Sequence, residues 1–145
     1  MRDLTLAKLR LKEKDLTLVI VKGGEVIFET GSHGITGFLQ AIEKLDKELI
    51  ESSVADKIVG RAAALLCVYS GVASVFAVAI SEEGMEVLKG SKIFYQFENL
   101  VPTILNHERT DVCPFERLTA GFLNPKEAYE KLKAYVNSTV RTSEG

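Results

Sequence analysis

Hydrophobic and polar positions follow two different periods in the first third of the chain. Residues 4–14 place apolar side chains at helical spacing among many charges, a pattern typical of a short amphipathic helix. The next two runs, 16–22 and 25–30, are rich in β-branched residues and are separated by Gly23 and Gly24. Two glycines permit a tight primed turn, so we predict a β-hairpin here.

The pattern changes to helical spacing in the middle of the chain. Residues 37–51 repeat apolar side chains every three or four positions with charges between them, which predicts an amphipathic helix that faces the core. After two serines, the segment 54–69 is predicted to form a second helix. Its later part, 62–68, has no polar face. A helix of this composition is expected to be buried, against a sheet.

The last part of the chain predicts a parallel crossover followed by helices. The run 74–80 is almost continuously apolar, which is typical of a central strand. Residues 82–89 are predicted to form a short helix, and residues 93–97 another strand. Two helices are expected at 114–121 and 125–137, the second capped by Asn124 and begun by Pro125, with a frayed tail at 138–145. These elements predict a three-layer α/β sandwich with a mixed sheet.

Composition limits the domain count and the environment. With 145 residues, 46% of them hydrophobic, we expect a single domain, 1–145, whose core spans about 16–137. The formal charge of −2 gives no general attraction to nucleic acid or acidic membranes. No apolar stretch is long enough to cross a bilayer, no signal-peptide pattern occurs, and the two cysteines do not indicate a disulfide framework. We therefore expect a cytoplasmic protein.

Three charged residues, Asp56, Lys57 and Arg61, stand at the start of the apolar predicted helix 54–69. In a helix Lys57 and Arg61 share a face, where they could grip a phosphate or carboxylate with help from the free N–H groups of the first turn. The alternatives are a solvent-exposed helix end or an internal ion pair between Asp56 and Arg61. The sequence leaves these interpretations open.

A second helix start carries a thiol. Cys113 precedes Pro114, which favours the first helical position, so Cys113 is predicted to be the N-cap and Glu116 the N3 residue of a start that resembles a capping box. The helix dipole and the nearby Arg109 and Arg117 favour the thiolate, the reactive form. Cys113 and Glu116 are thus the candidate catalytic pair. The alternative is a small, partly buried cysteine tolerated at a cap.

Other polar residues are weaker candidates. Glu82 follows a predicted strand end, where open α/β sheets bind ligands, and Asn106 could either bind a base or shape a turn. His33 and His107 are either proton carriers or ordinary surface residues. The histidines and cysteines lack the spacing of zinc ligands, so we predict neither a metal site nor a cofactor.

Four separated segments resemble one uncharacterised family. Residues 16–22, 54–66, 80–82 and 113–116 resemble the DUF1893 family, and the resemblance runs from about 16 to about 135. The resemblance implies a cytidine-deaminase-like fold. Zinc nucleobase deaminases carry H-x-E at one helix start and P-C-x-x-C at the next, whereas this sequence has D-K-x-x-x-R over 56–61 and S-E-E-G-M over 81–85. The resemblance therefore implies the fold and the approximate cleft, without the deaminase chemistry.

Three functions remain in competition. The first is binding of an anionic or nucleotide-like small molecule at helix N-termini. It is favoured because the sequence has charged residues at predicted helix starts but no set of metal ligands. The candidate binding residues are Asp56, Lys57, Arg61, Glu82, Asn106 and Arg109. The second is a zinc-independent enzyme with Cys113 as nucleophile or redox thiol. The third is a homo-oligomeric interaction module that uses Phe115, Phe122 and Tyr129.

Overall fold

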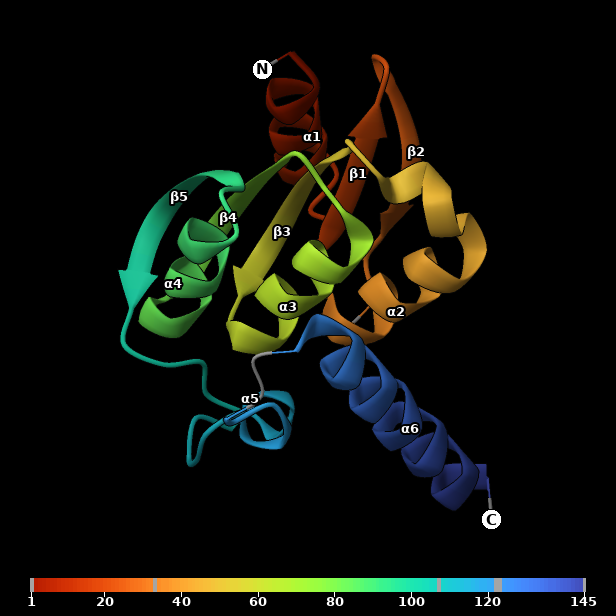
Figure 1. Cartoon of the computed structure of the whole chain (residues 1–145), viewed down its shortest axis with the longest axis vertical. Coiled ribbons are helices and arrows are strands. Elements are labelled where there is room, and N and C mark those ends of the chain that lie inside the picture. The colour runs from red at the N-terminus through yellow and green to blue at the C-terminus, as the bar shows by residue number, and fades with distance from the viewer. Residues whose placement is uncertain (1, 33, 107, 122–123, 145) are drawn as a thin grey trace.

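The structure is a computed structural model that describes residues 2–32, 34–106, 108–121 and 124–144, with the backbone alone described at 34 and 139–144. A five-stranded sheet forms its centre (Figure 1), with the strand order β2-β1-β3-β4-β5. The strands are β1 (Leu18–Lys22), β2 (Glu25–Thr30), β3 (Ser53–Val59), β4 (Ser74–Ser81) and β5 (Phe94–Val101). Strand β1 is antiparallel to both β2 and β3, whereas β3, β4 and β5 run parallel.

Helices cover both faces of the sheet. On one face, α1 (Arg2–Glu13) packs against β1, β3 and β4. On the other lie α2 (Gly34–Leu45), α3 (Arg61–Ser70) and α4 (Glu82–Gly90) (Figure 1). The predicted three-layer sandwich with a mixed sheet is therefore confirmed.

The sheet separates two hydrophobic cores of unequal size. The smaller one joins Leu4, Ala7 and Leu11 of α1 to the side chains of Val19, Val21, Ala55 and Phe76. The larger one includes Phe38 of α2 and Leu66 of α3, both fully buried, with the opposite faces of the same strands. Successive strand residues point to opposite faces, so one run such as 18–21 can supply both cores.

The predicted helix over 54–69 is wrong in its first half. Residues Ser53–Val59 form the central strand β3, Gly60 is the N-cap residue, and the helix α3 begins only at Arg61. The physical reason is burial on both faces, because a strand between β1 and β4 needs apolar side chains on both sides and therefore shows no alternation. As a result Lys57 and Arg61 do not share a helix face.

Element boundaries differ in smaller ways. The hairpin is as predicted, α2 begins at Gly34 and ends at Leu45 before a 3-10 turn at Asp46–Leu49, and β5 extends to Val101. After α5 (Pro114–Leu118), the last helix α6 runs over Pro125–Glu144 and so extends past its predicted end at residue 137 into the segment predicted as a tail. Its predicted cap is confirmed, since the Asn124 Oδ1 accepts the N–H of Lys126 at 2.9 Å.

Candidate functional site

The N-termini of α3 and α4 meet at the carboxyl ends of β3 and β4. Their close approach depends on Gly84, where a Cβ atom would lie 2.9 Å from the carbonyl oxygens of Val59 and Gly60. The hydroxyl of Ser81, the N-cap of α4, accepts the N–H of Gly84 at 3.0 Å. Two sets of helix N–H groups, and the positive ends of two dipoles, therefore gather at one edge of the sheet.

A carboxylate of the chain itself occupies the N-terminus of α3. Oε1 of Glu116 accepts the N–H of Arg61 at 2.6 Å, and Oε2 accepts the N–H of Ala62 at 2.7 Å. The Arg61 guanidinium also donates from Nη1 to the carbonyl oxygen of Glu116 at 3.2 Å. Glycine is required at the cap, because a Cβ on Gly60 would overlap Glu116 Oε1. Glu116 is buried, so α5 is anchored to α3 by hydrogen bonds to a carboxyl group that is largely shielded from solvent.

This contact corrects the predicted role of Glu116 at its own helix. Cys113 is the N-cap of α5 and Pro114 its first residue, as predicted, but the Glu116 carboxylate reaches across to α3 instead of closing a capping box. Each of its oxygens accepts one backbone N–H group, so each oxygen keeps one further lone pair for another donor.

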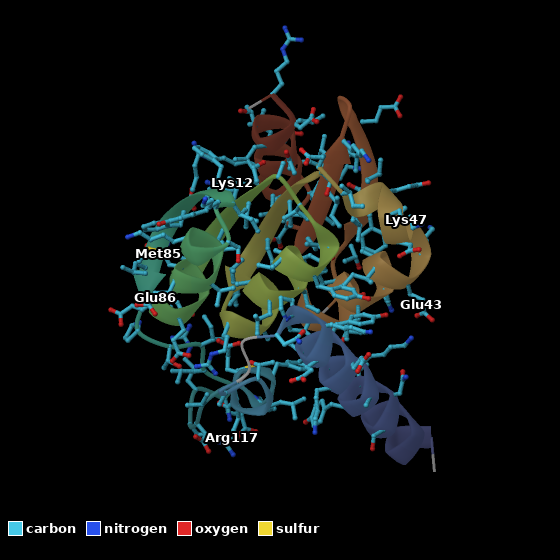
Figure 2. All side chains as sticks on the ribbon, viewed as in Figure 1. Lys12, Glu43, Lys47, Met85, Glu86 and Arg117 are labelled. Atoms are coloured by element: carbon cyan, nitrogen blue, oxygen red, sulfur yellow. The ribbon has the colours of Figure 1, made fainter. Side chains whose placement is uncertain are left out.

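Beside this contact lies a hollow of about 250 Å³. It is lined by Arg61, Ser81, Glu83, Thr103, Asp111, Val112, Glu116, Arg117 and Ala120. A neighbouring hollow of about 440 Å³ shares Arg61 and Glu83 with it and continues along α3 and α4. We call the first hollow the two-arginine pocket, because it presents guanidinium groups from α3 and α5. Figure 2 shows Arg117 on the α5 side, beyond the end of the sheet.

Each of these arginines has a carboxylate partner. Arg61 forms an ion pair with Glu83 of α4, and Arg117 forms one with Asp111. The hydrogen bond from Arg117 lowers the pKa of Asp111. The Arg61 side chain is 19% exposed, whereas those of Glu83, Asp111 and Arg117 are 49%, 60% and 62% exposed. Both carboxylate partners are therefore open to solvent and able to exchange for another anion.

Asp56 and Lys57 lie away from this pocket. The Asp56 carboxyl is fully buried in β3, and loss of hydration raises its pKa to about 7, although backbone N–H groups of Ile58 and Lys57 oppose the shift. Burial, with the Asp56 charge, also raises the pKa of the Cys67 thiol. Lys57 is exposed, with Nζ 3.6 Å from Asp15 after α1. Neither residue lines the two-arginine pocket, and Arg61 pairs with Glu83, so the alternative of an ion pair between Asp56 and Arg61 is not observed.

The remaining candidates also lie outside the lining of the pocket. Asn106 shapes a turn, because its Oδ1 accepts the N–H of Thr110 at 3.0 Å and its own N–H donates to the Asp111 carbonyl at 2.9 Å. Arg109, in the same turn, is exposed and has φ of 60°. Glu82 is exposed at the start of α4.

Cys113 is partly buried and does not line the two-arginine pocket. Its thiol makes no capping hydrogen bond, while its N–H donates to the Ile104 carbonyl at 2.9 Å. His33 and His107 lie outside the described residues. Within the described ranges, no group of three or more His, Cys, Asp and Glu side chains is arranged to hold a metal ion.

The aromatic residues expected at an oligomer surface pack within the chain. Tyr129 stacks on Tyr69 with ring centroids 4.5 Å apart, and Phe115 meets Tyr135 edge to face at 5.6 Å. Both Phe115 and Tyr129 contact the larger core, and Phe122 lies outside the described residues.

Sequence reasoning missed the partners that complete the site. No sequence pattern marks Glu83 and Asp111 as pocket residues, because a carboxylate that pairs with a side chain of another element leaves no local pattern. Gly60 carried a usable signal: a glycine between a β-branched run and an alanine-rich run is a natural boundary between strand and helix.

Comparison with known proteins places the chain in a family. The family model described as a domain of unknown function, DUF1893, matches residues 6–136. The chain belongs to the DUF1893 family. No curated protein matches the sequence. Among solved structures, a DUF1893 family protein from Thermotoga maritima is similar at a TM-score of 0.84 and 25% identity, covering 93% of this chain and 91% of that one.

More distant matches were found among solved structures. RibD from Acinetobacter baumannii, form 2, has a TM-score of 0.51 and 15% identity over 67% of this chain and 35% of its own, so the match spans about a third of that protein. The dCMP deaminase from cyanophage S-TIM5 has a TM-score of 0.47 and 14% identity over 68% and 94% of the two chains. The match to RibD supports the assignment of the fold and nothing about function. No helix within the described ranges is both long and apolar enough to span a membrane.

Proposed function

We propose that this chain binds a small phosphorylated metabolite, of the size of a nucleoside monophosphate, in the two-arginine pocket. The single observation that carries the proposal is that Arg61 and Arg117, from two different helices, line the same hollow. Guanidinium groups bind phosphate and carboxylate oxygens in a bidentate manner, and two of them suit a dianion better than a monoanion.

The present partners of the arginines are replaceable. Glu83 and Asp111 are about half exposed or more, so a phosphate that displaced them would return both carboxylates to water at little cost. Glu116, in contrast, is buried and held by two N–H groups, so it stays in place and the ligand binds beside it.

The rest of the lining suits a polar organic group. Ser81 and Thr103 offer hydroxyl groups, and the adjoining hollow adds Leu65, Val68 and Val87 as an apolar wall. A phosphate at the arginines would leave its sugar or base over this second hollow. The chemistry that fits is therefore an anionic head with a compact, partly apolar body.

A thermal-shift panel tests the proposal with nucleoside monophosphates, their parent nucleosides, ribose 5-phosphate and inorganic phosphate. Ligand at about 100 times its Kd stabilises the native state by about 2.7 kcal/mol, which is a readily measured rise in Tm. We expect the monophosphates to raise Tm and the nucleosides to do so far less.

Variants distinguish binding in the two-arginine pocket from nonspecific attraction of anions to positive charge. Arg117→Ala and Arg61→Lys are each expected to weaken binding about tenfold or more, because each removes one guanidinium fork. Lys57→Ala is the matched control, since its ammonium lies near Asp15, away from the pocket, and binding should not change. A panel with no shift, equal shifts for nucleosides and monophosphates, or equal losses in all three variants would overturn the proposal.

A further inference from the structure

Strand β5 ends the sheet and presents an unprotected edge. It has eight residues and pairs with β4 on one side, and within the described residues no strand pairs with the other side (Figure 1). Its outward N–H and C=O groups can therefore accept another strand. Natural edge strands are commonly protected by lysine, proline or a short length, whereas β5 has no proline and no basic residue.

Large apolar side chains are exposed along this edge. Phe94, Phe97 and Leu100 are 42%, 39% and 46% exposed. Alternation along the strand places Phe94 and Leu100 on the α1 face of the sheet and Phe97 on the α4 face. Only one charged residue occurs in β5, Glu98, and it forms an ion pair with Lys12 of α1, which Figure 2 labels near the end of that helix.

We propose that β5 pairs with β5 of a second copy of this chain, antiparallel about a two-fold axis at Phe97, to form a continuous ten-stranded sheet. The proposal concerns a surface separate from the two-arginine pocket. A second copy is the favoured occupant because the strand is complementary to itself when one copy is reversed.

Residues opposite each other in an antiparallel pair project on the same face, which limits the possible registers. With Phe97 on the axis, Phe97 meets its own copy and Phe94 meets the second copy's Leu100, so each exposed apolar side chain gains an apolar partner. Glu98 then faces the second copy's Gln96.

Neighbouring registers are poorer. An axis at Glu98 sets two carboxylates directly opposite each other, which is destabilising. An axis at Gln96 sets Phe94 against the second copy's Glu98 and leaves Leu100 beyond the paired segment. The charge pattern and the apolar pattern of β5 therefore select the same register.

The dimer is expected to be weak. One strand pair with a few side-chain contacts on each face lies at the low end of interface sizes, below the roughly 800 Å² per partner of standard complexes. Sedimentation velocity between about 1 µM and about 500 µM should show a monomer that converts to a dimer, with Kd in the micromolar range.

Phe97→Lys tests the axis, because it places two like charges opposite each other in the dimer while changing a side chain that is exposed in the monomer. We expect the dissociation constant to rise at least tenfold, or about 1.4 kcal/mol. Leu9→Lys is the matched control: Leu9 is 52% exposed on α1, so the same change of chemistry should leave the dimer intact. Circular dichroism and Tm check that both variants are folded.

Single cysteines test the register in a Cys113→Ser background, with the buried Cys67 retained. A short bis-maleimide reagent should cross-link Phe97→Cys to its own copy. It should not cross-link Leu100→Cys, because each Leu100 faces Phe94 of the other copy and the two Leu100 positions are six residues apart along the ladder. A monomer at every concentration, a dimer unaffected by Phe97→Lys, or failure of Phe97→Cys to cross-link would overturn the proposal.

Discussion

At the scale of single residues, Asp56 is a fully buried acid that forms no ion pair with any side chain in the described part of the chain. Its carboxyl sits in β3, where the N–H of Ile58 donates to it at 3.2 Å and desolvation raises its pKa to about 7. Because the native pKa is higher than the unfolded value near 3.8, the native state binds more protons between these two values. The contribution of this carboxyl group to the free energy of unfolding is therefore fully present below about pH 4 and is lost as the pH rises through about 7.

Asp56→Asn should remove this pH dependence, since an amide accepts the same hydrogen bond and does not ionise. Denaturant unfolding at pH 5 and pH 8 is the measurement: we expect the wild type to lose more stability across this range than Asp56→Asn, and the variant to be the more stable protein at pH 8. Asp15→Asn, at an exposed aspartate, is the control. Parallel pH profiles of wild type and Asp56→Asn would contradict the prediction.

Glu116 is a second buried acid, and both of its carboxyl oxygens accept backbone N–H groups. Glu116→Ala leaves the N–H groups of Arg61 and Ala62 without acceptors, and hydrogen bonds to charged groups contribute about 1.5–3 kcal/mol each. We expect a loss of about 3–6 kcal/mol in the free energy of unfolding, measured by urea denaturation. Glu86→Ala, an exposed glutamate of α4 labelled in Figure 2, should change it by less than about 0.5 kcal/mol. Equal effects at both positions would mean that water replaces the Glu116 carboxylate.

At the scale of elements, the same contact explains how α5 is docked on α3. Gly60 has an ordinary φ of −103°, so its requirement is steric and not conformational. A methyl group there would collide with the Glu116 carboxylate. The contact therefore couples a glycine in the β3–α3 connection to a glutamate more than fifty residues later.

A double-mutant cycle isolates this coupling. Gly60→Ala alone should destabilise by about 1–3 kcal/mol by displacing Glu116, whereas in a Glu116→Ala background the same change should cost almost nothing. Gly90→Ala is the control, because no atom lies within 4 Å of its added Cβ. Additive effects of Gly60→Ala and Glu116→Ala in urea unfolding would show that the two residues do not interact.

The elements also show what the sequence could and could not predict. The hairpin, β4, α4 and the cap of α6 followed from local signals, namely a glycine pair, an apolar run and Asn124 before a proline. The sequence pattern predicts helix for the residues of β3, because a strand buried on both faces has no alternation to mark it. The pocket partners of Arg61 were not predictable either, since they come from α4 and α5 and meet only after the sheet has formed.

At the scale of the whole molecule, one sheet serves two cores. Leu11 of α1 is 2% exposed on one side, and Leu66 of α3 is fully buried on the other. Strands β1, β3 and β4 carry residues of both cores, so neither core can lose its packing without disturbing strands that the other requires.

Because the two cores share these strands, we expect the chain to unfold as one cooperative unit, as the single-domain prediction requires. Leu11→Ala and Leu66→Ala should each lower the free energy of unfolding by about 2–5 kcal/mol, the usual cost of truncating a buried leucine. Each variant should retain a single urea transition in which far-ultraviolet circular dichroism and tyrosine fluorescence coincide. If Leu11→Ala instead produced an early transition with the Leu66 side unchanged, α1 would be a separately stable layer, and the shared strands would not couple the two cores.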